Sequence, residues 1–349
     1  MTTITPREHT ADETRQRTLR IFSGIRASGD KTLGNYSGGF RQYVATQERA
    51  AEAGGAAFFC VVDLHSITTP FEPEVLREST LAVFAWLLAT GLDPDRSTVF
   101  VQSHVRAHAE AAWLLGAVTG FGELRRMTQF KEKGEGQEFV SAGLFNYPVL
   151  MAGDILLYQT TVVPIGDDQR QHLELTRDVA ERFNQRFGET FAVPDGEYPE
   201  VGARIKNLQE PERLMSTTRG APQGVVRMND APDVVRKKFK SAVTDSGRDV
   251  RHAPEEKPGV SNLIEILSVA TGDSVAAIEA GYGDAGYGQF KEDVGDAVVA
   301  LLEPLQRRYE ELRSDEGELR RLLALGAEKA TEASAPTLAL MYERMGFVR

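Results

Sequence analysis

The stretch Leu19-Arg-Ile-Phe-Ser-Gly-Ile-Arg-Ala-Ser-Gly-Asp-Lys-Thr-Leu-Gly-Asn-Tyr36 decides the fold of this chain. It begins apolar and strand-like, glycines interrupt its middle, and Gly34 opens a segment predicted to be helical to about Glu52. Such a strand, turn and helix hold phosphate in nucleotide-binding folds, because the helix N-terminus offers unpaired N–H groups. An ordinary strand-to-helix turn has the same pattern. The stretch is neither the dinucleotide motif G-x-G-x-x-G nor the P-loop motif G-x-x-x-x-G-K-[ST].

The segments that follow alternate between strand and helix patterns. Residues 56–62 and 98–103 read as buried strands, and residues 74–90 and 107–118 read as helices. This order predicts an α/β fold with a parallel sheet, a Rossmann-type domain whose ligands bind at the carboxyl ends of the strands. The later expected elements are a surface excursion at 125–137, a helix at 144–158, a short strand at 160–165, a helix at 168–187, a loop at 194–223 and helices beyond 224.

Composition sets limits on the class of protein. The chain has 349 residues, enough for two domains, and no run of about 18 apolar residues, so we expect no membrane span. The polar first 18 residues are expected to be a disordered extension rather than a secretory signal. One cysteine, Cys60, suits a reducing cytoplasm and excludes thiolate metal clusters within the chain. We therefore expect a cytoplasmic protein without a metal site of its own.

The net charge of −11 argues against indiscriminate binding to nucleic acid. A local basic run, Arg236-Lys-Lys-Phe-Lys240, is the best candidate for contact with phosphates. The same run could equally be the solvated face of a helix.

Asp154 is out of place among the apolar side chains of the expected helix at 144–158. Helical spacing puts Tyr147, Met151, Asp154 and Tyr158 on one face. A carboxylate buried on such a face costs several kcal/mol, as an order of magnitude, unless a donor or a cation pairs with it. Two interpretations are open at this point: an internal pairing within the fold, or a polar contact with a ligand.

Four stretches resemble the tryptophanyl-tRNA synthetase family of class I aminoacyl-tRNA synthetases. Thr32-Leu-Gly-Asn35 resembles the T-x-G-N form of the first class I signature, and Tyr147-Pro-Val-Leu-Met-Ala-Gly-Asp-Ile-Leu-Leu-Tyr158 resembles the tryptophan-binding helix. Val163-Pro-Ile-Gly-Asp-Asp-Gln-Arg-Gln-His172 and Met127-Thr-Gln-Phe-Lys131 are similar to two further family motifs. The four stretches follow the family's order and spacing over nearly the whole chain.

The resemblance implies a synthetase that forms tryptophanyl-adenylate from L-tryptophan and ATP with Mg²⁺, then acylates the terminal 2′-hydroxyl of tRNA(Trp). It implies that Asp154 accepts the indole N–H, although His65 beside it could be an ordinary core histidine. The implied tryptophan-binding residues are Phe22, Gly24, His65, Gln129, Tyr147, Met151, Asp154, Val162, Val163 and Gln169. The implied ATP-binding residues are Arg26, Ala27, Ser28, Gly34, Asn35, Gly166, Asp167, Asp168, Ile205, Leu214, Met215, Ser216, Thr217 and Thr218. The implied catalytic residues are Gly34, Asn35, Lys131, Lys133, Met215 and Ser216.

The second class I signature, KMSKS, departs from the family. It reads Leu214-Met-Ser-Thr-Thr218, so both lysines are lost, and Arg26-Ala27 replaces the family's Gln-Pro in the first signature. Losing one donor that stabilises transition-state charge costs on the order of 10²–10³ in rate. We expect Arg26 to supply part of the lost charge, with Lys206, Arg213 and Arg219 as further candidates. The alternatives are an auxiliary or inhibitor-resistant paralogue with altered or reduced activity, or a regulatory RNA-binding paralogue.

The expected organisation has four parts: a disordered extension at 1–18, a Rossmann catalytic domain at 19–209, a KMSKS-like loop at 210–224, and a helical domain at 225–349. The resemblance implies that the helical domain binds the tRNA anticodon and that the protein is a homodimer paired through the Rossmann domain.

Overall fold

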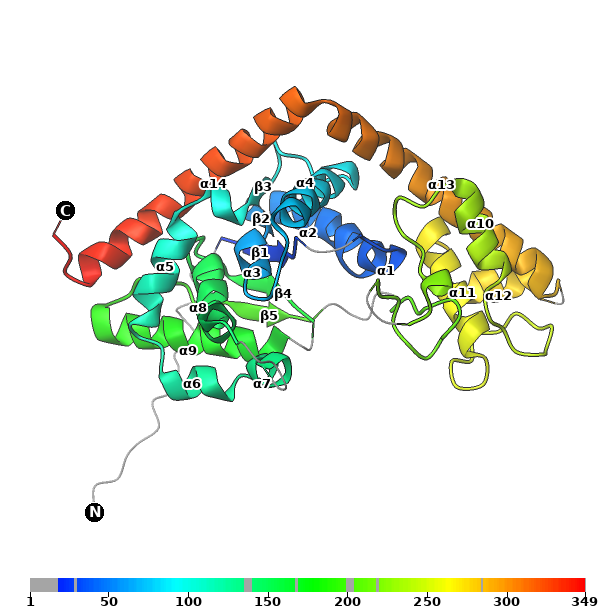
Figure 1. Ribbon diagram of the computed structural model, residues 1–349, viewed down its shortest axis with the longest axis horizontal. Helices are drawn as coiled ribbons and strands as arrows, with labels where there is room; N and C mark the ends of the chain where they lie inside the picture. The colour runs from blue at the N-terminus through cyan, green and yellow to red at the C-terminus, as the bar shows by residue number, and fades with distance from the viewer. Residues whose placement is uncertain are drawn as a thin grey trace, which may run out of the picture.

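A parallel five-stranded sheet lies at the centre of the larger part of the molecule (Figure 1). The computed structural model describes residues 18–27, 30–134, 140–166, 169–198, 204–217, 220–283 and 285–348. The strand order is β3-β2-β1-β4-β5. The strands are β1 (Arg20–Ile25), β2 (Ala56–Val61), β3 (Thr98–Val101), β4 (Val162–Pro164) and β5 (Asp195–Glu197).

This order confirms the α/β, Rossmann-type prediction and locates the binding edge. The chain moves outward from β1 to β2 and β3, then returns to pair β4 with the other side of β1. The direction of winding therefore reverses between β1 and β4. In open α/β sheets ligands bind at this point, outside the carboxyl ends of the strands.

Successive residues of the strands enter two different apolar cores, because side chains alternate across a sheet. In β2, Phe59 and Val61 face the core that includes α2 and α4, whereas Phe58 and Cys60 face the core that includes α5, α8 and α9. Both faces are covered, as a parallel sheet requires. The helices are α2 (Arg41–Glu52) and α4 (Pro73–Ala89) on one face, and α5 (Ala107–Gly116), α8 (Ala142–Leu156) and α9 (Arg170–Phe187) on the other.

The turn after β1 starts its helix with a capping box. The Thr32 hydroxyl accepts the N–H of Asn35, and the Asn35 side-chain oxygen accepts the N–H of Thr32. Helix α1 (Leu33–Asn35) continues through a π-helical turn, η1 (Tyr36–Phe40), into α2. The predicted helix from Gly34 to about Glu52 is therefore present, with a π-turn inside it.

Two parts of the sheet domain differ from the sequence prediction. The expected surface excursion at 125–137 contains all of α7 (Thr128–Gly134) and the end of α6 (Phe121–Arg126), and the expected loop contains β5. The Asp195-Gly-Glu197 segment has no apolar pattern and becomes a strand because it pairs with β4. The shorter elements of this domain are α3 (Asp63–Ser66) and η2 (Gln102–His104), and η4 (Pro222–Gly224) follows before the helical region.

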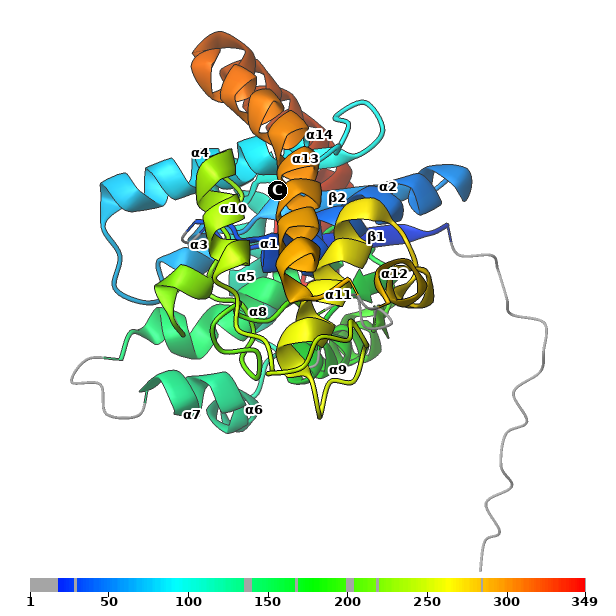
Figure 2. The same ribbon diagram turned by 90° about the vertical axis from the view of Figure 1, so that its right-hand side faces the viewer.

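Beyond residue 224, helices replace strands in the described part of the chain. Helices α10 (Pro232–Lys240), α11 (Pro258–Thr271) and α12 (Val275–Tyr282) gather beside the long α13 (Tyr287–Ser314), as Figure 2 shows. Pro at the first turn of α10 and α11, where no N–H partner is needed, favours those starting points. The stacked rings of Trp86 in α4 and Tyr309 in α13, 4.2 Å between centroids, join this group to the sheet domain.

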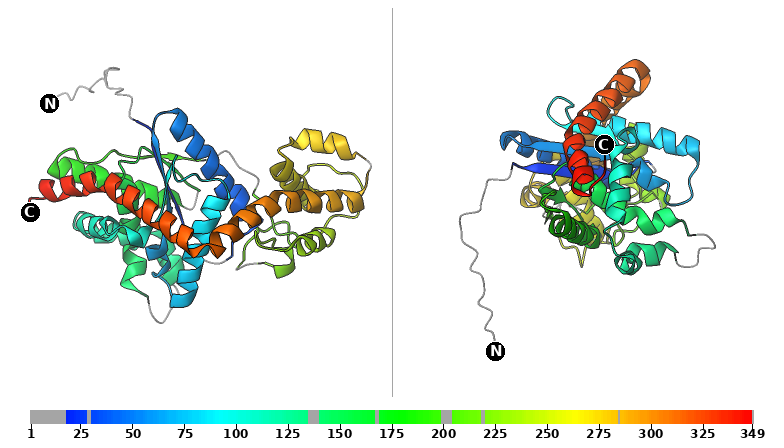
Figure 3. Two further views of the ribbon diagram at one scale, coloured as in Figure 1. Left: turned by 90° about the horizontal axis from the view of Figure 1, so that it is seen from above. Right: turned by 90° about the vertical axis from the view of Figure 1, so that its left-hand side faces the viewer.

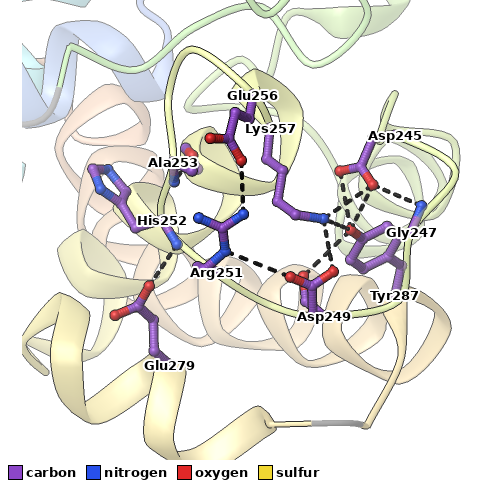
Figure 4. Close-up of polar contacts among 11 residues, drawn as sticks. Asp245, Gly247, Asp249, Arg251, His252, Ala253, Glu256, Lys257, Glu279 and Tyr287 are labelled. Carbon is purple, nitrogen blue, oxygen red and sulfur yellow. Dashed lines mark hydrogen bonds and ion pairs between the residues drawn. The ribbon is translucent and has the colours of Figure 1, made fainter.

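The long connection between α10 and α11 is held by one lysine. Figure 4 shows the Lys257 ammonium directed between Asp245, Asp249 and Tyr287. The hydrogen bond with Asp249, then those with Tyr287 and Asp245, raises the pKa of Lys257. All the polar groups around Lys257 in this cluster are paired with one another, so we assign the cluster a structural role in shaping the loop.

Helix α14 (Glu316–Arg344) turns back and lies along the sheet domain, as Figure 3 shows from above. Ala330 and Met341 belong to the same core as α5 and α8. A Cβ at Gly326 would lie 2.0 Å from the carbonyl oxygen of Val99, so glycine permits the close approach of α14 to β3. The last helix of the expected helical domain at 225–349 therefore packs against the sheet domain.

Among the described helices, none contains a stretch that is long and apolar enough to cross a membrane.

Candidate active site

A cavity of about 620 Å³ opens at the predicted edge of the sheet, beside the carboxyl ends of β1 and β4. Most of the residues expected to bind tryptophan, and two expected to bind ATP, share its wall. They are Phe22, Gly24, Arg26, His65, Gln129, Tyr147, Met151, Asp154, Val163, Gly166 and Gln169. Residues distant in sequence are therefore brought to one site by the strand order.

Val162 is the predicted tryptophan-binding residue that the structure places elsewhere. It lies in a shallow pocket near Leu19 and Arg49, while its neighbour Val163 lines the main cavity. The reason is the period of a strand, in which adjacent side chains point to opposite faces. A family motif that covers both valines does not distinguish them, whereas the pairing of β4 does.

Asp154 is 1% exposed, and its carboxylate meets the cavity with donors around it. Its Oδ1 accepts hydrogen bonds from Gln102 Nε2 at 2.7 Å and from His108 Nδ1 at 2.6 Å. Its Oδ2 lies 2.8 Å from His65 Nε2. The internal pairing of Asp154 is therefore confirmed, and because Asp154 also lines the cavity, a polar contact with a ligand stays a prediction.

The charge state of Asp154 follows from these contacts. Burial by itself raises the pKa of the carboxyl group, but the hydrogen bonds from His108 and His65 outweigh it and bring the pKa well below its usual range. Asp154 is therefore an anion at neutral pH, held by polar donors in a buried position.

Tyr158 does not share the cavity face of Asp154, contrary to the helical spacing. Helix α8 ends at Leu156, and the Tyr158 hydroxyl lies 2.9 Å from Nε2 of His108. The ring is fully buried and stacks on Phe58 at 4.6 Å between centroids. Burial raises the pKa of Tyr158, so its hydroxyl stays protonated.

Tyr147, near the other end of the same helix face, forms a second polar group. Its hydroxyl donates to Gln129 Oε1 at 3.1 Å and lies 2.5 Å from Nε2 of His172, which is 1% exposed. The rings of Tyr147 and His65 meet edge to face at 6.0 Å. The cavity therefore has a carboxylate at one end of α8 and an amide and a phenol further along it.

The turn after β1 brings two cations close together. Arg26 is exposed and lines the cavity, and its carbonyl oxygen accepts a hydrogen bond of 3.0 Å from Nζ of Lys31. Lys31 is 8% exposed, and burial together with the charge of Arg26 lowers its pKa to about 8. A role for Lys31 is not apparent from the sequence, because nothing in its spacing marks it as buried.

The second-signature segment lies next to the first. The N–H of Met215 donates to the carbonyl of Ile205, Leu214 forms a β-bridge with Lys206, and a Cβ at Gly34 would lie 3.6 Å from Cβ of Met215. Leu214, in the first lysine position, is 55% exposed. The two class I signatures are thus neighbours in space.

Other predicted ATP-binding and catalytic residues are not on the cavity wall. In the described part of the chain these are Ala27, Gly34, Asn35, Lys131, Ile205, Leu214, Met215, Ser216 and Thr217. Ser28, Asp167, Asp168, Thr218 and Arg219 fall outside the described residues, as does the side chain of Lys133. The Asn35 side-chain oxygen is engaged in the capping box, so its present contact is structural.

The predicted basic run is partly neutralised by carboxylates. Arg236 pairs with Asp233 and Asp296, and Lys238 pairs with Asp230. Lys237 and Lys240 are exposed on α10. Two of the four cations in the run are therefore paired with carboxylates of the same chain.

Comparison with known proteins agrees with the geometry. The family model "tRNA synthetases class I (W and Y)" matches residues 14–303. A tryptophan–tRNA ligase of Corynebacterium glutamicum is 50% identical over 340 residues, which is 97% of each chain. The structure of tryptophanyl-tRNA synthetase from Mycoplasma pneumoniae is 36% identical with a TM-score of 0.82, covering 95% of this chain and 98% of its own. The Campylobacter jejuni enzyme, complexed with ADP and tryptophan, is 31% identical with a TM-score of 0.81, covering 94% and 100%.

The chain therefore belongs to the W and Y family of class I aminoacyl-tRNA synthetases.

Proposed function

We propose that this chain is a working tryptophan–tRNA ligase. Its substrates are L-tryptophan, ATP with Mg²⁺ bound to the phosphates, and tRNA(Trp). A tryptophan carboxylate oxygen attacks the α-phosphorus, the bond to the bridging oxygen breaks, and pyrophosphate leaves. The terminal 2′-hydroxyl of the tRNA then attacks the acyl carbon of the adenylate and AMP leaves.

The observation that carries this proposal is the buried Asp154 anion on the cavity wall. An indole N–H is a donor within a large apolar ring, and the cavity combines one acceptor with the apolar side chains of Phe22, Met151 and Val163. A site that must satisfy a buried polar group rejects analogues without the partner far better than an apolar pocket does. Phenylalanine has no ring N–H, so it would leave this acceptor unpaired.

The rest of the cavity suits the polar part of an amino acid. Gln129 and Gln169 offer amide groups and Tyr147 offers its hydroxyl, on the same cavity wall as Arg26. These groups would hold the substrate ammonium and carboxylate and so direct the carboxylate toward the nucleotide. Positioning of this kind, with stabilisation of phosphate charge, is sufficient for adenylate formation without a protein nucleophile.

Arg26 is the cation best placed to contact the phosphates. It lines the cavity, and a guanidinium forms bidentate contacts with phosphate oxygens. Lys31 donates a hydrogen bond to the Arg26 carbonyl oxygen and adds positive charge to the same turn. We assign to this pair part of the charge that the second signature has lost, and the exposed Arg213 remains a further candidate.

For the tRNA, Lys237 and Lys240, which are exposed on α10, would contact phosphates. A cytoplasmic location stays a prediction that rests on the reduced state of a single cysteine.

We also propose that two copies pair through the sheet domain. Trp113 in α5 is 83% exposed and Phe121 in α6 is 69% exposed, on consecutive helices of that domain. Large aromatic side chains are enriched in protein interfaces. Sedimentation velocity of the wild type and of Trp113→Asp tests this proposal: a dimer that becomes a monomer supports it, and a wild-type monomer at micromolar concentration contradicts it.

The experiment that tests the proposed function is amino-acid-dependent exchange of pyrophosphate into ATP, with tryptophan, tyrosine, phenylalanine and no amino acid. We expect exchange with tryptophan alone, followed by acylation of tRNA(Trp). Tryptophan binding without exchange would instead indicate a paralogue that kept its pocket and lost its chemistry.

A further inference from the structure

We infer that Gln102 and His108, which do not line the cavity, are positioning residues that hold Asp154 for a single hydrogen bond from the indole N–H. This inference rests on the proposed function. It is based on the different contacts of the two carboxylate oxygens and on the burial of the side chains that make those contacts.

Each carboxylate oxygen offers about two lone-pair sites. Both sites of Asp154 Oδ1 are filled, by Gln102 Nε2 at 2.7 Å and His108 Nδ1 at 2.6 Å. Oδ2 has one neighbour of this kind, His65 Nε2 at 2.8 Å. The remaining lone pair of Oδ2 is therefore the acceptor assigned to the indole N–H.

The proton on Nδ1 of His108 follows from its contact with Asp154. An ionised carboxylate has no proton to give, so at 2.6 Å Nδ1 is the donor and Asp154 Oδ1 the acceptor. On the other side of the ring, Nε2 lies 2.9 Å from the hydroxyl of Tyr158, and both side chains are 0% exposed. Tyr158 thus orients His108, and His108 orients the carboxylate.

The hydrogen bonds between Asp154 and its two Oδ1 donors are formed by buried side chains. Gln102 follows β3, His108 belongs to α5, and Asp154 belongs to α8, and all three are 1% exposed or less. Such a network costs free energy if a single partner is missing, because the others are left unpaired in a poorly solvated interior. We therefore expect changes at Gln102 or His108 to appear in tryptophan recognition even though neither touches the substrate.

The titratable groups around Asp154 come from every neighbouring element. They are His65 and Asp63 from α3, Cys60 from β2, His108 from α5 and Tyr158 after α8. Of these, His108 and His65 lower the pKa of Asp154 through hydrogen bonds, against the effect of burial. Removing His108 therefore raises the pKa of Asp154.

The test compares L-tryptophan with β-(3-benzothienyl)alanine, which has sulfur in place of the indole N–H. Calorimetry gives both dissociation constants for the wild type, His108→Leu, Gln102→Leu and His108→Asn. We expect the wild type to prefer tryptophan and the two leucine variants to lose about tenfold of that preference, with little change for the analogue. His108→Asn keeps an N–H near the Nδ1 position, so we expect it to keep most of the preference.

A pH series separates positioning from packing. Between pH 7 and 5 we expect the wild-type preference for tryptophan over the analogue to stay constant, because Asp154 remains ionised. In His108→Leu the preference should fall as the pH falls, because the Asp154 carboxylate then becomes protonated and no longer accepts from the indole. If His108→Leu does not fold, the preference of Gln102→Leu for tryptophan over the analogue at a single pH tests the positioning role.

The outcomes are distinguishable. A wild type that binds the analogue as tightly as tryptophan overturns the indole contact, and with it both the proposed recognition and this inference. A normal wild-type preference that survives both leucine substitutions overturns the positioning role alone, as does an equal loss of affinity for both ligands.

Discussion

The two ends of the cavity are built in different ways. At the amino-acid end, Asp154 is 1% exposed and held by donors from three other elements at 2.6–2.8 Å. At the end proposed to hold the phosphates, Arg26 on the cavity wall is exposed, as are Thr217 and Leu214 (55%), which lie off the wall in the two lysine positions of the second signature. The difference indicates that the carboxylate proposed to contact the indole is already held in place in the free chain, whereas Arg26 and the second signature, proposed to contact the phosphates, are exposed to solvent.

The largest effect is expected from Asp154→Asn. The amide keeps one acceptor oxygen in place of two, so either Gln102 and His108 or His65 and the indole N–H would lose their acceptor. A loss on this scale lowers kcat/KM for tryptophan by about 10³-fold. Pyrophosphate exchange measures it, and Asp178→Asn on the exposed side of α9 is the matched control. A loss below tenfold would show that the amino-acid end does not depend on this anion.

Lys31→Met probes the cost of burying charge at the phosphate end. The pKa of Lys31 is lowered to about 8 from 10.5, so above pH 8 the unfolded chain binds more protons at this residue than the folded chain does. The free energy of unfolding then rises with pH between about 8 and 10.5, by an amount on the order of 3 kcal/mol.

Lys31→Met should lack this rise and be the more stable form below pH 8. Urea unfolding of the wild type and the variant across this pH range measures the difference between their free energies of unfolding. The contributions of the other titrating groups are common to both proteins and cancel in that difference. Parallel stability curves would contradict a buried, charged Lys31.

Arg26→Gln should separate chemistry from binding. If Arg26 supplies phosphate-binding charge, adenylate formation slows by about 10²-fold while tryptophan binding changes little. Single-turnover adenylate formation and calorimetric tryptophan binding measure the two effects, with Arg248→Gln in the helical region as control. Equal losses in both would place Arg26 at the amino-acid end.

Leu214→Lys is expected to give the smallest effect, and unlike the other variants it should increase the rate of adenylate formation. Because Leu214 is exposed, a lysine fits there, and it restores one charge of the second signature. We expect the rate of Arg26→Gln to recover by about tenfold when Leu214→Lys is added. No recovery in the double variant would mean that positions 26 and 214 do not both supply charge to the phosphates.

The fold could be predicted because its signals are local. The apolar strands, the glycines after β1 and the helical spacing beyond 224 determine the elements, and the parallel order follows from their alternation. The edge strand β5 could not be predicted, because Asp195-Gly-Glu197 becomes a strand through pairing alone. The return of α14 to the sheet depends on the close approach at Gly326, which no periodic pattern reveals.

The candidate site was predictable where a family motif names a residue and less so where a contact crosses the fold. Asp154, Tyr147 and Gln169 were found in this way and lie on one wall. His108 was missed, because a single histidine in an apolar helix has no pattern that distinguishes it from a core residue. Lys31 was missed for the same reason, since burial of a lysine after a turn is a property of the packed structure.

The most direct test of the account is calorimetric titration of the free chain with L-tryptophan and L-phenylalanine, without nucleotide. If the amino-acid end is set before ATP arrives, tryptophan binds alone and at least about 10²-fold more tightly than phenylalanine. Tryptophan binding that requires ATP, or equal affinity for the two amino acids, would contradict the account.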